Sequence, residues 1–158
     1  MKVEKRPSKN GFGVFATAGM KAGESVLEWK GKIINSYSEA KAMSEDAEGH
    51  IIQFGKERYL DPKGTGRFVN HSCDPNCRVK IEGERVYLIA LRDIEDGEEI
   101  TFDYSTTMDE DNWEMECNCG SKNCRKNIRD FKYLPKKLRD HYIKLGIVPE
   151  YARRSAEK

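Results

Sequence analysis

Residues 67–77 read RFVNHSCDPNC, a run in which an apolar pair directly precedes amide, imidazole, hydroxyl and thiol side chains. Surface loops seldom place two apolar residues, here Phe68 and Val69, immediately before such a polar block. The run therefore predicts a buried strand-to-turn segment whose polar groups contact a ligand. The residues alone leave one alternative open, a hydrogen-bonded structural turn with a satisfied core histidine at His71.

A second informative run extends from Gly97 to Tyr104 and reads GEEITFDY. Alternation along this run places Ile100, Phe102 and Tyr104 on one face of a strand. A tyrosine at the end of such a face is usually part of the core, but its hydroxyl can also point into a cleft.

The rest of the body consists of short β-rich runs that glycine and proline turns separate. The capping pair Ser36 and Glu39 precedes Ala40, Met43 and Ala47 and predicts one short helix from about 37 to 47. The strand-like runs are Gly11–Ala16, Glu24–Trp29, Lys32–Asn35, Ile51–Phe54, Glu57–Leu60, Arg78–Ile81, Val86–Leu91 and Glu99–Tyr104. Because strands are many and helices few, the predicted class is mainly β, and a doubly wound fold is excluded.

The chain has 158 residues, a length that fits one domain. Charged residues make up 35% of it but the net charge is only +1, so bulk charge gives no argument for nucleic-acid binding. The sequence contains no apolar run long enough to span a membrane, and its charged start, Met1 to Ser8, lacks the apolar centre of a signal peptide. These features predict an intracellular, soluble protein.

Three of the five cysteines lie in the run CNCGSKNC, from Cys117 to Cys124. An odd number of cysteines in an intracellular chain argues against disulfides, and this C-x-C-x4-C spacing favours thiolate ligands of one Zn²⁺. Structural zinc takes four ligands, so the fourth must be Cys73, Cys77 or a histidine. A structural clip, a binding module of the zinc-ribbon kind and three unpaired thiols are the readings that the cluster allows.

Charge is segregated along the chain. Residues 91–116 hold eleven acidic residues that only Arg92 opposes, and residues 131–154 hold seven basic residues that only Asp140 and Glu150 oppose. Such runs usually form solvated faces, although an acidic surface can also attract lysine-rich peptides.

The last part of the chain predicts a helix between Pro135 and Gly146, because proline suits a first helical turn and glycine suits a helix end. Its apolar face consists of Leu134, Leu138, Tyr142 and Leu145. This face can cover the chain's own domain or pack on a partner, and the first of these is favoured.

Together these runs resemble the SET family of protein lysine methyltransferases. The likeness rests on the Gly-Phe-Gly run at 11–13, RFVNHSCDPN, GEEITFDY and the cysteine run, in the family's order and spacing, and it extends from Gly11 to Arg125. A lone glycine motif is weak, but the middle run followed by the tyrosine run is highly specific. The resemblance implies a SET fold of short strands in several small sheets with a knot-like crossing at the active site. It also implies a SET domain at 1–105, a post-SET zinc segment at 113–129 and a C-terminal helical extension at 130–158, with no pre-SET zinc cluster.

The resemblance further implies S-adenosylmethionine as cofactor and a structural Zn²⁺. It makes Tyr104 the catalytic tyrosine and places Phe102, Trp29 and Tyr59 in the substrate channel. The residues implied to bind the cofactor are Gly11, Phe12, Gly13, His50, Arg67, Asn70 and His71. The implied zinc ligands are Cys73, Cys117, Cys119 and Cys124, which leaves Cys77 spare. The family usually has tyrosine where His50 and Trp29 stand in this chain.

The implied activity is methyl transfer to lysine in histone or other lysine-rich protein tails, and Phe102 implies a bias towards di- or trimethylation. The expected partner is a lysine-containing protein or peptide, without direct nucleic-acid or membrane binding, and the expected assembly is a monomer or weak homodimer. The expected location is the cytoplasm, or the nucleus and chromatin in a eukaryote. Two alternatives remain: a zinc-dependent protein or nucleic-acid binding module with a decayed active site, and a structural or multimerising protein.

Overall fold

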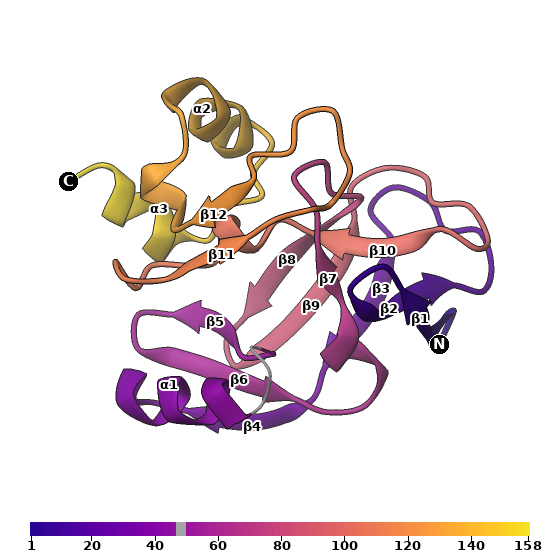
Figure 1. The fold of residues 1–158 in the computed structure, drawn as a ribbon, viewed down its shortest axis with the longest axis horizontal. Coiled ribbons are helices and arrows are strands. Elements are labelled where there is room, and N and C mark those ends of the chain that lie inside the picture. Colours follow the sequence, from indigo (N-terminus) through magenta and orange to yellow (C-terminus); the bar gives the residue numbers. More distant parts are fainter. Residues whose placement is uncertain (47–49) are drawn as a thin grey trace.

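The computed structural model describes residues 1–46 and 50–158, so that Ala47 of the predicted helix lies outside them. As predicted, the body is mainly β, and its described strands form several small sheets (Figure 1). The largest has the order β1-β2-β10-β7, from Val3–Ser8, Gly11–Ala16, Glu99–Phe102 and Asn70–His71. The other orders are β3-β9-β8, β4-β6-β5 and β11-β12. Their strands are β3 Ser25–Trp29, β4 Gly31–Ile34, β5 Ile52–Gly55, β6 Arg58–Pro62, β8 Cys77–Glu82, β9 Arg85–Ala90, β11 Glu114–Glu116 and β12 Asn127–Arg129.

The helices are short and lie at the margins of these sheets (Figure 1). They are α1 Tyr37–Asp46, α2 Lys136–Lys144 and α3 Glu150–Ala156, with the single-turn helices η1 Thr65–Phe68, η2 Tyr104–Thr106 and η3 Phe131–Tyr133. No helix in the described part of the chain is long and apolar enough to cross a membrane.

The two most informative sequence runs meet in the largest sheet. Strand β7 pairs in parallel with β10, which aligns Asn70 with Thr101 and His71 with Phe102. Residues far apart in the sequence are thereby placed side by side at the point where β10 ends.

One apolar core supports that meeting point. It includes Val14, Leu88 and Ile100, which have no exposed surface, and also Trp29 and Phe102 at 3% and 4% exposure. The alternating burial of β2 and β10 follows from the strand period of two, which sends every second side chain into this core. Because buried side chains interdigitate closely, Trp29 and Phe102 are held in fixed positions by this core.

The C-terminal helices have a second apolar cluster, made of Phe131, Leu134, Tyr142, Ile147 and Ala152. The predicted helix is confirmed as α2, but the prediction for Leu145 is wrong, because its side chain is 50% exposed. Gly146 adopts a left-handed conformation, with φ of 67°, directly after the helix. The chain turns back there, so Ile147 takes the buried place.

Four of the helices and strands were not predicted from the sequence. Strand β1 forms an antiparallel edge hairpin with β2, and most of its side chains face solvent. The short helix α3 follows Pro149, which precedes its first turn. Strands β11 and β12 form a hairpin on either side of the cysteine run.

Candidate active site

The strand that carries the tyrosine run is shorter than predicted. Strand β10 ends at Phe102, and Tyr104 begins the turn η2 instead of continuing the strand face. The Asp103 side chain causes this change, because it caps η2 by accepting a hydrogen bond from the Ser105 amide at 3.0 Å. Tyr104 therefore leaves the strand face and turns towards β7.

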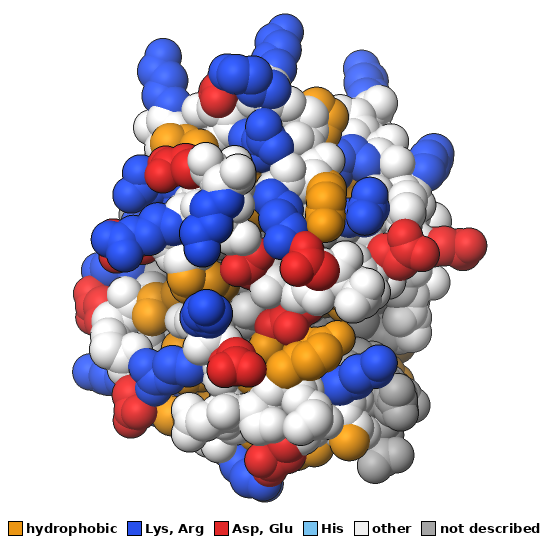
Figure 2. Space-filling model, turned by 90° about the vertical axis from the view of Figure 1, so that its left-hand side faces the viewer, with side chains coloured by type: hydrophobic (Ala, Val, Ile, Leu, Met, Phe, Trp, Pro, Cys, Tyr) orange, Lys and Arg blue, Asp and Glu red, His pale blue; other side chains and the backbone are white. Residues whose placement is uncertain are grey.

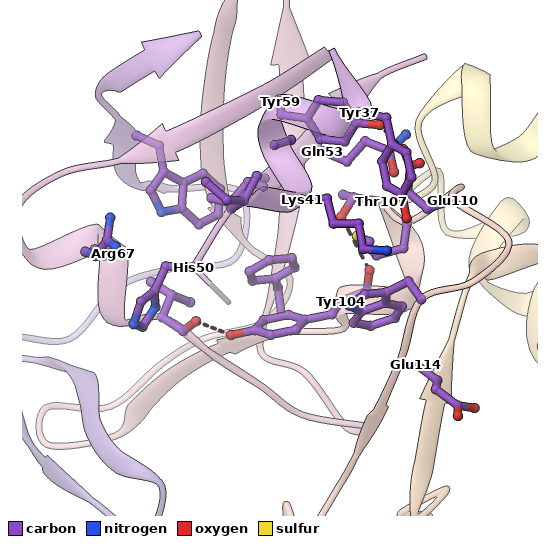
Figure 3. A pocket seen from close by; sticks show the side chains of 18 of the residues that line it. Tyr37, Lys41, His50, Gln53, Tyr59, Arg67, Tyr104, Thr107, Glu110 and Glu114 are labelled. Atoms are coloured by element: carbon purple, nitrogen blue, oxygen red, sulfur yellow. Dashed lines mark hydrogen bonds between the residues drawn. The ribbon is translucent and has the colours of Figure 1, made fainter. Parts of the chain in front are cut away.

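The Tyr104 residue is fixed at both ends. Its backbone amide donates to His71 Nδ1 at 3.1 Å, and its hydroxyl donates to the Val69 carbonyl at 2.7 Å (Figure 3). Burial raises the pKa of the Tyr104 phenol, and the nearby charge of Glu99 raises it further. The phenol is thus neutral across the physiological range, and its hydroxyl proton stays in the hydrogen bond to the Val69 carbonyl.

A cavity of about 320 Å³ opens on one side of Tyr104. Figure 3 shows Arg67 and His50 at one end and Tyr37, Tyr59 and Glu110 at the other. The three residues predicted for the substrate channel, Trp29, Tyr59 and Phe102, all line this cavity. The fold therefore places Tyr104, the predicted catalytic residue, and the predicted channel residues around one cavity.

Aromatic packing shapes the floor of that cavity. The ring of Phe102 lies 5.5 Å from the ring of Trp29 and 4.8 Å from the ring of Tyr104, measured between centroids. The indole of Trp29 donates from Nε1 to the Gly66 carbonyl at 2.8 Å. A side chain at Gly66 would clash, because its Cβ would lie 2.9 Å from Trp29 Cδ1. The tryptophan is thus held in place by the turn before β7.

A second, smaller cavity of about 130 Å³ lies on another side of Tyr104. Its lining includes Asn70 and His71 from β7, Asn10 before β2, and residues of the cysteine run and β11. Tyr104 lines both cavities. Two molecules that enter these cavities would accordingly approach the same phenol.

The residues predicted to bind a cofactor are divided between these places. Asn70 and His71 line the small cavity, whereas His50 and Arg67 line the large one. The run Gly11 to Gly13 is not among the lining residues of either cavity. It adjoins the small cavity through Phe12, whose carbonyl accepts from the Asn70 amide at 2.8 Å.

The position of the Glu99 carboxylate explains Gly13. A Cβ at residue 13 would lie 2.3 Å from Glu99 Oε1, which accepts hydrogen bonds from Ser8 and Asn70. The absence of a side chain at Gly13 therefore leaves room for the carboxylate that holds the Asn70 side chain.

His71 has a structural role in addition to its place in the small cavity. Since its Nδ1 accepts from the Tyr104 amide, the proton of the neutral ring is on Nε2, which faces the sulfur of Cys73 at 3.3 Å. Burial lowers the pKa of His71 to about 4, and Arg125 contributes to this against the opposing charge of Asp103. The neutral ring links the catalytic turn to the cysteine cluster.

The predicted zinc ligands come together in space. The sulfur atoms of Cys73, Cys117, Cys119 and Cys124 all lie within 4.8 Å of one another, and the Cys73–Cys117 pair is 3.8 Å apart. Zinc–sulfur bonds in a tetrahedron place sulfur atoms about 3.8 Å apart, so this donor set fits Zn²⁺. Cys77 is buried in the main apolar core instead, and the geometry thus selects Cys73 among the fourth ligands left open by the sequence.

Sequence reasoning missed part of the wall of the large cavity. The missed lining residues include Tyr37, Gln53, Thr107, Met108, Glu110 and Trp113. Glu110 accepts a hydrogen bond from the Tyr59 hydroxyl, and burial with the charges of Asp130, Glu57 and Asp111 raises its pKa to about 7 against the influence of Lys132. The sequence feature that could have identified Trp113 is its position as a large aromatic residue within the acidic run at residues 91–116.

Comparison with known proteins gave a consistent result. The model of the SET domain family matches residues 11–105. Histone-lysine N-methyltransferase 2B of Homo sapiens is 32% identical over 146 residues, which cover 77% of this chain and 5% of that protein. Histone-lysine N-methyltransferase trithorax of Drosophila virilis is 33% identical, over 75% of this chain and 3% of that protein. The variant-silencing SET domain-containing protein of Plasmodium falciparum is 36% identical, over 76% and 5%. The chain thus spans a small fraction of the length of these relatives.

Proposed function

The chain belongs to the SET-domain family, and from that premise we propose that it is a protein-lysine methyltransferase that uses S-adenosylmethionine. One observation carries the proposal: Tyr104 lines two cavities, and its neutral phenol is fixed by Val69 and by the His71-bonded turn. A methyl donor in the small cavity and a lysine in the large one would meet at this phenol. Two of the three relatives described above bear the name histone-lysine N-methyltransferase.

The cofactor side of the proposal concerns the small cavity. Asn70 lines this cavity, and its hydrogen bond to the Phe12 carbonyl places the run Gly11 to Gly13 beside it; such polar surroundings suit a nucleoside. S-adenosylmethionine, when bound, supplies a methyl group on a sulfonium that a neutral amine takes by direct displacement. We place His50 and Arg67 in the cofactor group with Asn70 and His71, although these two line the large cavity.

The lysine side of the proposal concerns the large cavity. A lysine ammonium has an ordinary pKa near 10.4, so it must lose a proton before it can react. The apolar walls of Trp29 and Phe102 disfavour the charged form, and they exclude water from the reacting atoms. The Tyr104 hydroxyl already donates a hydrogen bond to the Val69 carbonyl, so the lone pairs of its oxygen remain to accept from the amine and orient it. The pocket thus acts by alignment and desolvation, and the proton leaves through water.

The substrate proposed is a basic peptide, from a histone or from another lysine-rich protein. Glu110 and Glu114 line one part of the large cavity and stand in the acidic run of the sequence. Carboxylates at the mouth of a cavity favour cationic chains near the target lysine. Phe102 has no hydroxyl that could hold a partly methylated amine, which favours di- or trimethylation as the product.

The four cysteines form the proposed zinc clip. Zn²⁺ bound by Cys73 and the three cysteines of the loop would join the segment after β7 to the segment after β11. This joins the small cavity's two sides, because Cys117 and Cys119 line it opposite Asn70 and His71. A zinc-dependent binding module without catalysis is the alternative function.

The test is a methyl-transfer assay with labelled S-adenosylmethionine and a panel of lysine-containing proteins that includes histones. We expect label on lysine for at least one basic protein, mapped by mass spectrometry, and none with the Tyr104→Phe variant. Cofactor binding measured by calorimetry without any transfer to the panel would favour the binding module. The absence of both binding and transfer would overturn the proposal.

A further inference from the structure

A buried carboxylate connects the catalytic turn to two later segments of the chain. Asp103 is 1% exposed, directly precedes Tyr104, and receives both guanidinium nitrogens of Arg125 at 2.8 Å. Its Oδ2 also accepts from the hydroxyl of Tyr142 in α2 at 2.8 Å. The Ser105 amide completes the set of donors. A buried charge needs such donors, because each missing one leaves a desolvated oxygen without a partner.

This arrangement sets the position of Tyr104. The same Asp103 carboxylate that meets Arg125 and Tyr142 also caps η2, the turn on which Tyr104 stands. Arg125 directly follows the cysteine ligand Cys124, and Tyr142 belongs to the helical extension. The orientation of the Tyr104 turn therefore depends on bonds from Arg125 after the cysteine run and from Tyr142 in α2. Neither the cysteine run nor α2 lines the large cavity.

A second tyrosine of the extension holds the cavity wall itself. The hydroxyl of Tyr151, in α3, lies 3.1 Å from the Gln53 carbonyl and 2.6 Å from the Thr107 carbonyl. Gln53 is in β5 and Thr107 follows η2, and both residues line the large cavity. Gln53 also accepts from the Asp109 amide through Oε1 at 2.9 Å. One phenol thus connects two neighbouring segments of the wall, β5 and the turn after η2.

We propose that Tyr142 and Tyr151 are positioning residues of the reaction: Tyr142 orients the Tyr104 turn through Asp103, and Tyr151 fixes the part of the lysine-cavity wall where Gln53 and Thr107 meet. This inference rests on the proposed function. Neither tyrosine is among the residues that line the large cavity. Their effects are separable, because one hydroxyl acts on the group that aligns the amine and the other on the walls that receive the side chain.

The experiment compares three tyrosine-to-phenylalanine variants of the full chain. Phenylalanine keeps the ring and removes only the hydroxyl. Tyr133→Phe is the matched control, because Tyr133 also stands in the extension but its hydroxyl donates to the exposed Asp111. For Tyr142→Phe we expect kcat to fall about tenfold while KM for the peptide changes less than about twofold. For Tyr151→Phe we expect KM to rise about tenfold with kcat nearly constant. Tyr133→Phe should resemble the parent chain.

Amide hydrogen exchange gives a second readout that does not need activity. Tyr142→Phe should increase exchange in residues 103–107, and Tyr151→Phe should increase it in residues 52–54 and 107–109, with the other segments unchanged. Zinc content and thermal unfolding show whether each variant is folded.

The outcomes separate this inference from the proposed function. If the parent chain transfers methyl groups but all three variants share its kinetics and its exchange pattern, the inference is wrong. The same conclusion follows if kcat and KM change together in both variants, because the two hydroxyls then have no separable effects. A fall in kcat alone supports the role of Tyr142 only when zinc content and thermal unfolding match those of the parent, because a loss of folded protein also lowers the apparent kcat. If the parent chain transfers no methyl group, the proposed function fails, and the exchange pattern alone decides whether the two hydroxyls order the cavity.

Discussion

The body of the molecule, residues 1–116, and its tail region, residues 117–158, are built on different principles. The body folds around one large apolar core and contains Tyr104 with most of the cavity walls. The tail region has a small apolar cluster, and its contacts with the body include a cysteine set, one buried ion pair and a few hydroxyls. Under the proposed function, the reacting groups lie in the body, and the tail region holds them in position.

The two regions also differ in charge. Residues 1–116 hold sixteen Lys and Arg against twenty-three Asp and Glu, and residues 117–158 hold twelve against four. Figure 2 shows Lys and Arg side chains crowded over the upper part of one face, where α2 and α3 lie in Figure 1. By net charge, residues 1–116 would therefore attract a basic peptide and residues 117–158 would repel it. Opposite charges on the two regions also favour their attachment.

The largest effect should come from the body itself. Tyr104→Phe removes the phenol at the junction of the cavities, and we expect kcat to fall about a thousandfold. Binding of S-adenosylmethionine, measured by calorimetry, should remain within a few fold. A variant that retained full turnover would show that the body does not use this phenol and would break the division of roles described above.

The next effect should come from the metal clip. Cys119→Ser removes one of four sulfur ligands, so we expect loss of zinc by elemental analysis and a decrease in Tm of about 10 °C. Cys77→Ala is the control, because Cys77 lies in the apolar core and its loss should leave the zinc content unchanged. Zinc retained in Cys119→Ser would mean that the tail region is attached without the metal.

A smaller effect should appear in the pH dependence of stability, through the carboxyl group of Glu110 in the body and the charge of Asp130 in the tail region. The pKa of Glu110 is about 7 in the folded chain, above its ordinary value of 4.5, partly because of the charge of Asp130. The folded state therefore binds a proton more tightly than the unfolded state, and the free energy of unfolding should decrease as pH rises through this interval. Glu110→Gln should be more stable than the parent at pH 8 by about 1 kcal/mol, and equal to it near pH 4.

Chemical denaturation at several pH values measures this difference. Glu114→Gln is the matched control, because Glu114 lines the same cavity but is exposed. An identical pH dependence in all three proteins would contradict the account of Glu110.

The smallest change in free energy should follow Phe102→Tyr. The added hydroxyl enters the floor of the large cavity, where it can bond a partly methylated amine and leave less room for further methyl groups. We expect the product to shift towards monomethyl-lysine in mass spectra, with turnover changed only a few fold. An unaltered product distribution would show that Phe102 contributes packing alone.

The sequence predicted those parts of the molecule that local patterns determine. Alternating apolar residues located most strands, and cysteine spacing located three members of the cysteine cluster, which Cys73 joins in the structure as the family likeness implied. Strand β1 was not predicted, because its charged residues stay exposed in an edge hairpin and hide the apolar alternation. Helix α3 was not predicted, because a helix of its length shows no clear apolar period. The turn of Tyr104 escaped as well, because it depends on how Asp103 meets Arg125 and Tyr142.

The wall of the large cavity was the least predictable part of the site. Gln53, Thr107 and Trp113 come from separate segments, and no spacing between them carries a signal. Their meeting depends on tertiary packing and on the attachment of α3, which a single sequence does not encode in any local pattern. Sequence motifs therefore located the candidate site residues but not the shape of the space around them.

The parallel pairing of β7 with β10 has a consequence for the order of folding. Strand β7 contains only two residues, and its partner lies beyond the whole β8–β9 hairpin. Such a pairing gains few hydrogen bonds against the entropy of closing a loop, so it forms after that hairpin has shortened the path between the partners. A refolding chain should regain its β-sheet circular dichroism first and its turnover last. Newly synthesised molecules would accordingly pass through an interval in which they are compact but inert.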